Sequence, residues 1–456
     1  METTFDRFVG GKFTSVQLTE QLLRRAEQTA DHGAFTTLDA DRALEAAWSA
    51  DHATERGPLH GLPLAIKDNI HVAGLANTAG SKALSGFVPR QDAEAILRLR
   101  AAGAIVLGKT NMHEFAFGAT CARGSYGPVR NPADPARFAG GSSGGTAAAV
   151  AAGSAPAGLG TDTGGSVRIP AALTGIVGFR PTTRRYPTGG VSPLSWTRDT
   201  IGPMAPSVAG VAILDAVLAG DSTPIRIPAT QDLVLAVPEH HFTSPLHPHT
   251  ETVWEHCLET LRRAGITIKP VRLPEIETIG ERVGFPITLY EAARQLPDYL
   301  GRVTGQDPAL CLPQVGDPDV CSAMREFVLD GAPRKVTDLD YKHALQIRER
   351  VLLASYAQIF RSADAVLFPT TPAPAGLIET EADQVQLGGV QCPTFATYIR
   401  NTEPGSLAGL PGITVPARRA DSGLPVGVAL DGSPHTDRGL LGIGLLVEQL
   451  LGGGAW

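Results

Sequence analysis

The chain has 456 residues, 43% of them hydrophobic, and a formal net charge of −7 at pH 7. It is long enough to bury a large core, and no run of Lys or Arg exceeds two residues, which excludes an evident surface for nucleic acid or anionic lipid. No segment approaches the roughly 18 uninterrupted apolar residues that span a bilayer. The first residues, METTFDRFVGGKFTS, lack a basic start followed by an apolar stretch, so we expect no targeting segment there. We therefore expect a cytoplasmic protein with a small-molecule partner.

Helical and strand patterns alternate along the whole chain. Helices are expected after a capping box of Thr14 and Gln17 and over 41–55, 92–102, 146–152, 250–264 and 341–360. Strands are expected at 62–66, 104–107, 176–179, 233–237, 266–268, 365–368, 413–415 and 426–430. No internal repeat or long polar linker divides the chain, so the mixture predicts one α/β domain around a mixed sheet. The Pro-rich stretch at about 281–340 is expected to form a helical insertion over the site.

Two motif matches fail on their context. GAIVLGKT at 103–110 fits the phosphate-loop pattern, but its variable residues are typical of a strand and a helix precedes them, whereas a true phosphate loop follows its strand. GSSGG at 141–145 fits GxSxG, but a nucleophile elbow needs a strand immediately upstream, and 130–139 shows no strand pattern. We therefore expect neither an NTPase nor an α/β-hydrolase with Ser143 as nucleophile. Five widely spaced cysteines without a CxxC pair indicate neither a disulfide framework nor a zinc site.

The segment 140–172 concentrates glycine around a few hydroxyl groups: GGSSGGTAAAVAAGSAPAGLGTDTGGSVRIPAA. Such composition suits a flexible linker, but interleaved Ala, Val and Ile followed by a strand pattern favour a packed segment. Glycine pairs can direct consecutive N–H groups toward one point. One interpretation is a serine nucleophile surrounded by the backbone N–H groups of Thr163, Gly164, Gly165 and Ser166, which would bind the oxyanion.

A serine nucleophile needs a base. No motif connects any of the twelve histidines to this segment, and His113 in NMHEF lacks the second histidine of HExxH. Lys67 follows the apolar stretch 62–66, and burial there could lower its pKa by up to roughly 3 to 5 units. The alternative is a structural lysine that is ion-paired with Asp68 or Asp162.

Taken together, Lys67, GGSSGG at 140–145 and GTDTGGSVRIPAA at 160–172 resemble the amidase signature family, whose members hydrolyse carboxamides. The resemblance extends through KDNIHVAG, GKTNMHEFAFG, YGPVRNPADP and VGFRPT. It implies one amidase domain over 1–456 with a catalytic core at about 60–210, a mixed sheet of about eleven strands, and neither cofactor nor metal. It also implies a triad of Ser166 as nucleophile, Ser142 on a cis peptide bond as proton relay, and Lys67 as base.

Segments 186–210 and 397–417 resemble the branch of the family that holds indoleacetamide and mandelamide hydrolases. This implies an acyl-enzyme mechanism on an aryl-acetamide or similar apolar primary amide. Candidate pocket walls are Met112, Phe117, Trp196 and Tyr290. Carbamate or ester cleavage by the same triad and the role of an amidotransferase A-type subunit are the alternatives, and the resemblance also suggests a homodimer.

Overall fold

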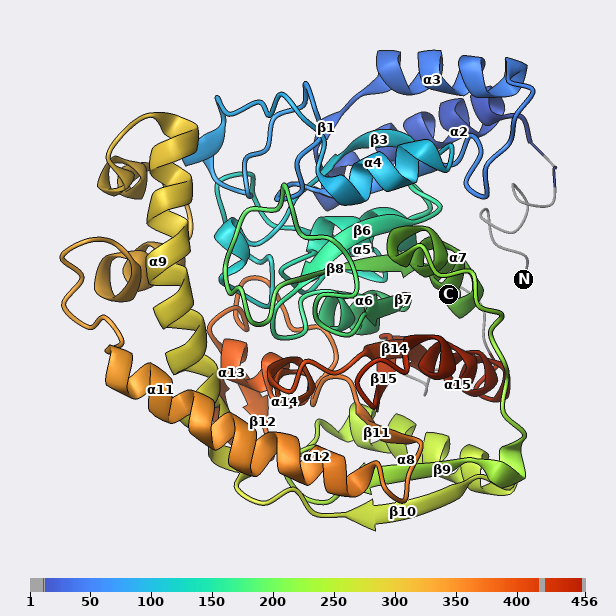
Figure 1. Cartoon of the computed structure of the whole chain (residues 1–456), viewed down its shortest axis with the longest axis vertical. Coiled ribbons are helices and arrows are strands. Elements are labelled where there is room, and N and C mark those ends of the chain that lie inside the picture. The colour runs from blue at the N-terminus through green and yellow to red at the C-terminus, as the bar shows by residue number, and fades with distance from the viewer. Residues whose placement is uncertain (1–10, 12, 418–422, 453–456) are drawn as a thin grey trace.

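The structure is a computed structural model that describes residue 11 and residues 13–417 and 423–452 (Figure 1). Eleven strands form its central mixed sheet. In chain order they are β1 (Phe35–Leu38), β2 (Pro63–Lys67), β3 (Ile105–Thr110), β6 (Gly158–Asp162), β7 (Val177–Arg180), β8 (Thr200–Ala205), β9 (Val234–Pro238), β10 (Thr267–Val271), β11 (Ala365–Pro369), β14 (Gly412–Ala417) and β15 (Val426–Gly432). The sheet order is β1-β3-β2-β6-β8-β7-β14-β15-β11-β9-β10. The predicted α/β class and eleven-stranded mixed sheet are confirmed, whereas the predicted domain limits at residues 1 and 456 lie outside the described residues.

Helices pack against the sheet and extend along one side of the molecule. In chain order they are α2 (Ser15–Gln28), α3 (Ala40–His52), α4 (Glu94–Ala101), α5 (Gly144–Ala151), α6 (Arg168–Thr174), α7 (Val208–Ala219), α8 (Pro248–Arg263), α9 (Phe285–Thr304), α10 (Pro318–Ala323), α11 (Asp338–Ile347), α12 (Ala354–Ile359), α13 (Thr394–Ile399), α14 (Glu403–Leu407) and α15 (Asp437–Leu450). α5 and α6 pack together on the central strands, while α7 contacts both α4 and α15. Figure 1 shows α9 along one edge of the molecule, with α11 and α12 running from its lower end toward β9 and β10.

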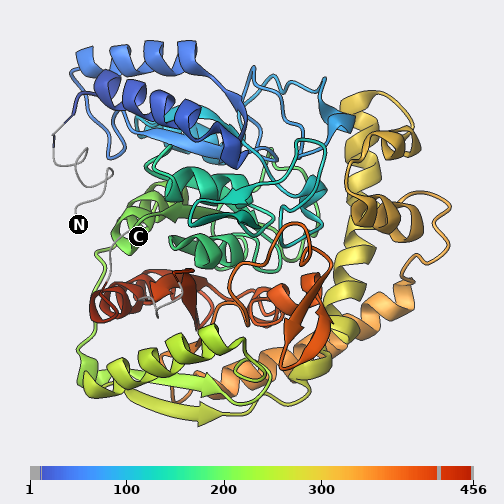
Figure 2. The same ribbon diagram turned by 180° about the vertical axis from the view of Figure 1, so that it is seen from behind.

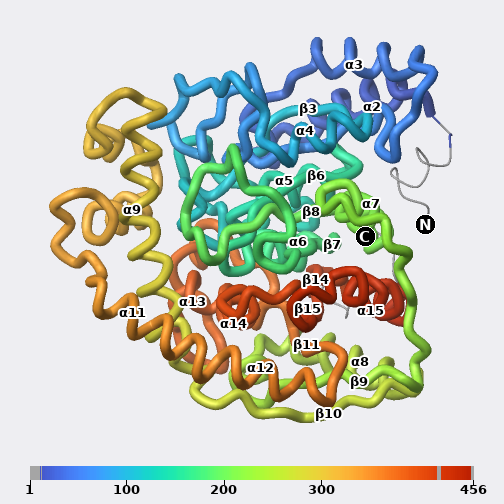
Figure 3. The backbone as a smooth tube through the Cα atoms, viewed as in Figure 1, coloured from blue at the N-terminus to red at the C-terminus, as the bar shows by residue number. Residues whose placement is uncertain are grey.

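Two features bring segments that are distant in sequence into position: the connection from α7 to β9 and the hairpin beside α9. The tube in Figure 3 shows the chain leaving α7 and running along one side to β9 at the far end of the sheet. Seen from behind in Figure 2, the hairpin of β12 (Gln384–Leu387) and β13 (Val390–Pro393) lies close to α9. Phe285 of α9 and Phe395 of α13 are in ring contact, with centroids 6.1 Å apart, so the two views and the contact agree. The segments 285–304 and 384–399 therefore lie side by side.

The local patterns of the sequence are largely reproduced. Thr14 and Gln17 form the predicted capping box of α2 through reciprocal side-chain to backbone hydrogen bonds. The predicted helix at 341–360 is present as α11 and α12, joined by a π-helical turn. In contrast, 130–139 was expected to contain no strand but forms the two-stranded hairpin of β4 (Arg130–Asn131) and β5 (Asp134–Phe138). Proline is tolerated there because a two-stranded hairpin has an unpaired edge on each strand.

The glycine-rich segment is packed and is not a linker. Residues 144–150 of α5 are buried. A Cβ on Gly145 would lie 2.3 Å from the carbonyl oxygen of Asn111, so only glycine allows this close approach. α5 contacts both β2 and β6.

The site is positioned by two neighbouring strands. β2 and β6 pair in parallel, with Ile66 opposite Leu159, so their carboxyl ends lie at the same edge of the sheet. Lys67 ends β2, and Asp162 ends β6. The turn at 140–143 precedes α5, and the turn at 163–167 precedes α6, which brings both serine-containing turns to that edge.

No helix in the described ranges is sufficiently long and apolar to cross a membrane. All five cysteines are free thiols, and three of them are buried.

The segment 281–340 is helical where it contains α9 and α10. The inner side of α9 packs its Leu296 and Leu300 with Phe115 and Val320 in a separate small core.

Candidate active site

Lys67 and Ser142 form the buried centre of the site. Lys67 Nζ lies 2.7 Å from Ser142 Oγ and 2.8 Å from Thr161 Oγ1, and both lysine and serine are fully buried. The Gly141–Ser142 peptide bond is cis, and the Ser142 carbonyl oxygen accepts the His113 N–H. Asn69 Nδ2 also donates to Thr161 Oγ1, at 3.1 Å. The lysine is therefore held between two hydroxyl groups.

Lys67 makes no ion pair among the described residues. Asp68 pairs with Lys109 at 3.0 Å, and Asp162 pairs with Arg168 and Arg180. Asp68 and Asp162, the two carboxylates that the structural alternative pairs with Lys67, are thus paired with other residues. Burial lowers the pKa of Lys67 from its ordinary value of 10.5 to about 7, although nearby acidic groups act in the opposite direction. A substantial fraction of this amine is neutral near pH 7.

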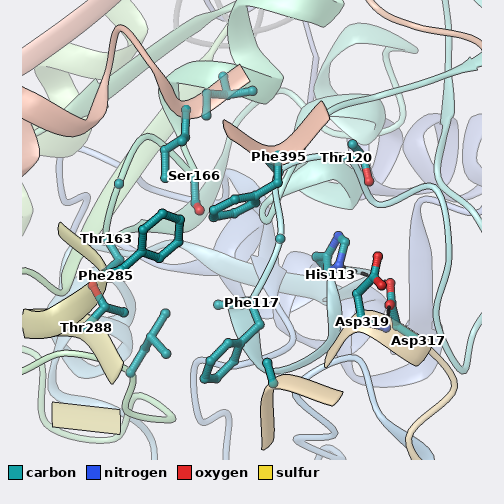
Figure 4. Close-up of a pocket in the computed structure, with 18 of the residues that line it drawn as sticks. His113, Phe117, Thr120, Thr163, Ser166, Phe285, Thr288, Asp317, Asp319 and Phe395 are labelled. Carbon is teal, nitrogen blue, oxygen red and sulfur yellow. Dashed lines mark hydrogen bonds and ion pairs between the residues drawn. The ribbon is translucent and has the colours of Figure 1, made fainter. Parts of the chain in front are cut away.

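Ser166 lies at the cavity and not in the buried centre. Its side chain is half-buried and lines the cavity (Figure 4). Its carbonyl oxygen accepts the Ser143 N–H at 3.1 Å, which ties the two serine turns together. No hydrogen bond joins the hydroxyl groups of Ser142 and Ser166 within the described part of the chain. The structure thus brings Lys67 and Ser142 into contact and leaves Ser166 beside them with a free hydroxyl.

Ser143 has a different role from its neighbour. Its hydroxyl donates to the Thr161 carbonyl oxygen and accepts the Thr161 N–H, both at 3.2 Å. The side chain is fully buried and does not line the cavity. Ser143 therefore fastens the 140–143 turn to β6.

The turn at 162–166 directs its carbonyl groups into the protein. The carbonyl oxygens of Asp162, Thr163, Gly164 and Gly165 accept hydrogen bonds from Arg180, Arg198, Thr402 Oγ1 and the Ile169 N–H, respectively. The N–H groups of Thr163, Gly164 and Ser166 have no acceptor among the described residues, and these three residues line the cavity. Three backbone donors are thus available to a ligand in the cavity.

Gly165 is a correction to the predicted set of oxyanion donors. Its N–H donates to Asp162 Oδ1 at 2.9 Å and is therefore unavailable to a substrate. Gly165 has φ +135°, and a Cβ there would lie 2.0 Å from Thr402 Oγ1. The residue is needed for the shape of the turn and not as a donor.

A cavity of about 580 Å³ opens in front of Ser166. Its walls are largely apolar, and Figure 4 shows Phe285 and Phe395 on either side of Ser166, with Phe117 farther from the serine. Other apolar wall residues are Ile169, Leu194, Leu289 and Ile399. The helical segment 281–340 contributes to this wall through Phe285, Thr288 and Leu289 of α9.

Only Phe117 of the four predicted wall residues lines the cavity. Met112 is 2% exposed and packs beneath Gly80. Trp196 and Tyr290 instead contact each other and Tyr341, whose ring stacks on Tyr290 with centroids 3.9 Å apart. These aromatic residues stabilise the packing of α9 on α11 and are not part of the site.

One end of the cavity is polar and was not predicted from the sequence. His113 Nδ1 accepts the Cys121 N–H, so Nε2 carries the hydrogen and faces Asp317 Oδ2 at 3.2 Å. Arg123 and Asp383 form an ion pair at 2.6 Å near Asp319. His113 lies in NMHEF, which lacks the second histidine of HExxH, and no other local pattern indicates this end of the cavity. No cluster of three His, Cys, Asp or Glu residues suited to a metal occurs within the described ranges.

Several known proteins are similar to this chain over nearly its whole length. The family model for Amidase matches residues 17–441. Mandelamide hydrolase of Pseudomonas putida is 39% identical, over 97% of this chain and 89% of its own length. Indoleacetamide hydrolase of Agrobacterium vitis is 36% identical, over 98% of this chain and 96% of its own. A solved amidase crystal structure covers 98% of this chain and 99% of its own, with a TM-score of 0.87 and 36% identity.

Proposed function

This chain belongs to the amidase signature family and is an amidase, and from that premise we propose that it hydrolyses an apolar primary amide, such as an aryl-acetamide, through an acyl-enzyme on Ser166. The observation that carries the proposal is the hydrogen bond of 2.7 Å between an unpaired, buried Lys67 and Ser142, beside a cavity that holds the Ser166 hydroxyl. The hydrogen bond from the Ser143 N–H to the Ser166 carbonyl oxygen, which ties the two serine turns together, also supports the proposal.

A neutral Lys67 can act as a base toward Ser142. A neutral amine has two N–H groups and one lone pair, and three oxygens surround Nζ: Ser142 Oγ, Thr161 Oγ1 and, at 3.5 Å, the Thr161 carbonyl oxygen. If both N–H groups donate to Thr161, the lone pair faces the Ser142 hydroxyl. Ser142 can then give its proton to Lys67 while it accepts one from Ser166.

The reaction begins when the Ser166 oxygen attacks the amide carbon. The Ser166 proton passes to Ser142 and the Ser142 proton to Lys67, which requires the Ser166 hydroxyl to turn toward Ser142 as substrate fills the cavity. The developing oxyanion accepts hydrogen bonds from the N–H groups of Thr163, Gly164 and Ser166. Protonated Lys67 returns its proton through Ser142 to the leaving nitrogen, and ammonia departs from the acyl-enzyme. Water activated by the same relay then cleaves the ester and releases the carboxylate.

The cavity supports an apolar acyl group. Phe117, Phe285 and Phe395 offer ring faces and edges to an aryl group, and about 580 Å³ accommodates one or two rings. Two similar proteins are named for the hydrolysis of indoleacetamide and mandelamide, both aryl-substituted acetamides. The likeness of those relatives therefore favours the same substrate class for this chain.

A panel scored for ammonia release tests the proposal. It contains phenylacetamide, indole-3-acetamide, mandelamide, propionamide and glutamine, with methyl phenylacetate and phenyl carbamate scored for acid or phenol release. We expect the aryl-acetamides to have the highest kcat/KM among the amides. A preference for the carbamate or ester by more than the intrinsic reactivity difference would contradict the amide assignment, and a preference for glutamine would favour an amidotransferase role.

A further inference from the structure

Arg198 lies directly beside the turn that carries the proposed oxyanion donors. β6 and β8 pair antiparallel with Asp162 opposite Thr200, so residues 198 and 199 face the turn at 163–164. Arg198 Nε donates to the Thr163 carbonyl oxygen at 2.9 Å. The Thr163 hydroxyl donates to Asp199 Oδ1 at 2.6 Å. Thr163 is therefore held through both its carbonyl group and its side chain.

The Thr163 carbonyl and the Gly164 N–H belong to the same peptide unit. This unit is trans, since Gly141–Ser142 and Ser244–Pro245 are the cis bonds of the described chain. In a planar trans peptide the C=O and N–H bonds point in opposite directions. A donor that fixes the Thr163 carbonyl thus also fixes the direction of the Gly164 N–H, and Gly164 lines the cavity.

The Arg198 guanidinium is itself firmly held. Its NH1 group donates to Thr288 Oγ1 at 2.6 Å and to the Gly284 carbonyl oxygen at 3.3 Å. Its NH2 group pairs with Glu403 Oε1 at 3.3 Å, and a Cβ on Gly164 would lie 3.2 Å from NH2. Only 2% of Arg198 is exposed, so the guanidinium is a fixed support against which the turn packs.

We propose that Arg198 is a positioning residue that aims the Gly164 N–H at the carbonyl oxygen under attack. The inference rests on the proposed function, because it assumes that this N–H binds the oxyanion formed by Ser166. Arg198 also lines the cavity, but its three guanidinium nitrogens already donate to protein oxygens. In this inference it therefore acts through the Thr163–Gly164 peptide and not by binding the reacting amide. Its loss should therefore affect the transition state more than the binding of substrate.

The variant Arg198→Lys tests this role. Lysine keeps a positive charge beside Glu403 but has no nitrogen at the position of Nε, so the bond to the Thr163 carbonyl is lost. Arg185→Lys is the matched control, because Arg185 binds Asp215 and Asp221 outside the cavity lining. For each protein we measure kcat and KM on the fastest amide of the panel, and the rate at which phenylmethanesulfonyl fluoride labels Ser166. We also measure the inhibition constant of propylbenzene, an apolar molecule that has no oxygen for the oxyanion donors to bind.

For Arg198→Lys we expect kcat to fall by about 10- to 100-fold, somewhat less than the loss of a whole oxyanion donor. The labelling rate should fall by a similar factor, whereas KM and the inhibition constant of propylbenzene should change by less than about threefold. The Arg185→Lys control should keep wild-type kcat and labelling.

Unchanged kcat and labelling in Arg198→Lys would overturn the inference, as would a raised KM with unchanged kcat, which would make Arg198 a substrate-binding residue. If Arg198→Lys does not fold, the double variant Arg198→Gln with Glu403→Gln, which buries no unpaired charge, is judged by the same criteria. A wild-type protein that is not labelled at Ser166 would refute the proposed function and this inference together. Labelled wild type with an unaffected Arg198→Lys variant would refute the inference alone.

Discussion

The acid limb of the pH–rate profile follows from the environment of Lys67. Only the neutral amine accepts a proton, and burial lowers the pKa of Lys67 to about 7. With that pKa the neutral fraction is about 9% at pH 6, about 50% at pH 7 and about 91% at pH 8. kcat/KM should therefore rise about tenfold from pH 6 to pH 8 and then level off. An ordinary lysine would be only about 0.3% neutral at pH 8, and the rate would still climb beyond pH 9.

The assay is the initial rate of ammonia release from phenylacetamide, well below KM, between pH 5.5 and 9.5 at constant ionic strength. Protein preincubated at each pH and then assayed at pH 8 controls for denaturation. Asp431 needs its own control, because burial raises its pKa to about 7 as well. Asp431→Asn should leave the midpoint in place. A flat profile from pH 6 to 8, a rise that continues past pH 9, or a midpoint abolished by Asp431→Asn would refute the role of Lys67.

Three further predictions follow from the contacts. Ser166→Ala and Lys67→Ala should each lower kcat by about 10³-fold or more while circular dichroism stays native, and appreciable activity in Lys67→Ala would remove it as base. Ser143→Ala leaves the Thr161 N–H without its acceptor and the Thr161 carbonyl oxygen with only the 3.5 Å contact to Lys67 Nζ, so urea unfolding should show a loss of about 1–3 kcal/mol. Its kcat should stay far above that of the triad variants, and a loss of kcat equal to that of Ser166→Ala would contradict this structural role. Phe117→Ala should raise KM for phenylacetamide about tenfold, whereas Trp196→Ala, which lies outside the cavity wall, should not; equal effects on KM would argue against the wall as described.

Most strands with aliphatic or β-branched cores could be predicted from the sequence. β2, β3, β11 and β15 each contain a run of mostly apolar residues, and such runs are typical of buried strands. β6 (GLGTD) and β8 (TIGPMA) were missed because glycine and proline weaken any local strand pattern. They are strands because they pair with each other and with β2 and β7, which is a long-range effect.

The candidate site likewise has a part that could be predicted from local sequence and a part that could not. The turns that carry Ser142 and Ser166 are contiguous motifs, so their neighbours in sequence are also their neighbours in space. The cavity wall comes from separate segments, and no local pattern distinguishes Phe285 and Phe395, which face the cavity, from Tyr290, which packs against Trp196. Arg198 lies in the segment 186–210, but its contact with Thr163 depends on the pairing of β6 with β8. The local pattern that could have indicated a role for Arg198 is a charged residue just before a buried strand.

The central claim is that Ser166 carries the acyl group. The most direct measurement is peptide mass spectrometry of protein that is mixed with p-nitrophenyl phenylacetate and quenched in acid during the burst phase. The account predicts one phenylacetyl group, located on Ser166, in wild type and none in Ser166→Ala. A phenylacetyl group on Ser142, Ser143 or Cys121, or turnover of the ester without any covalent intermediate on Ser166, would contradict it.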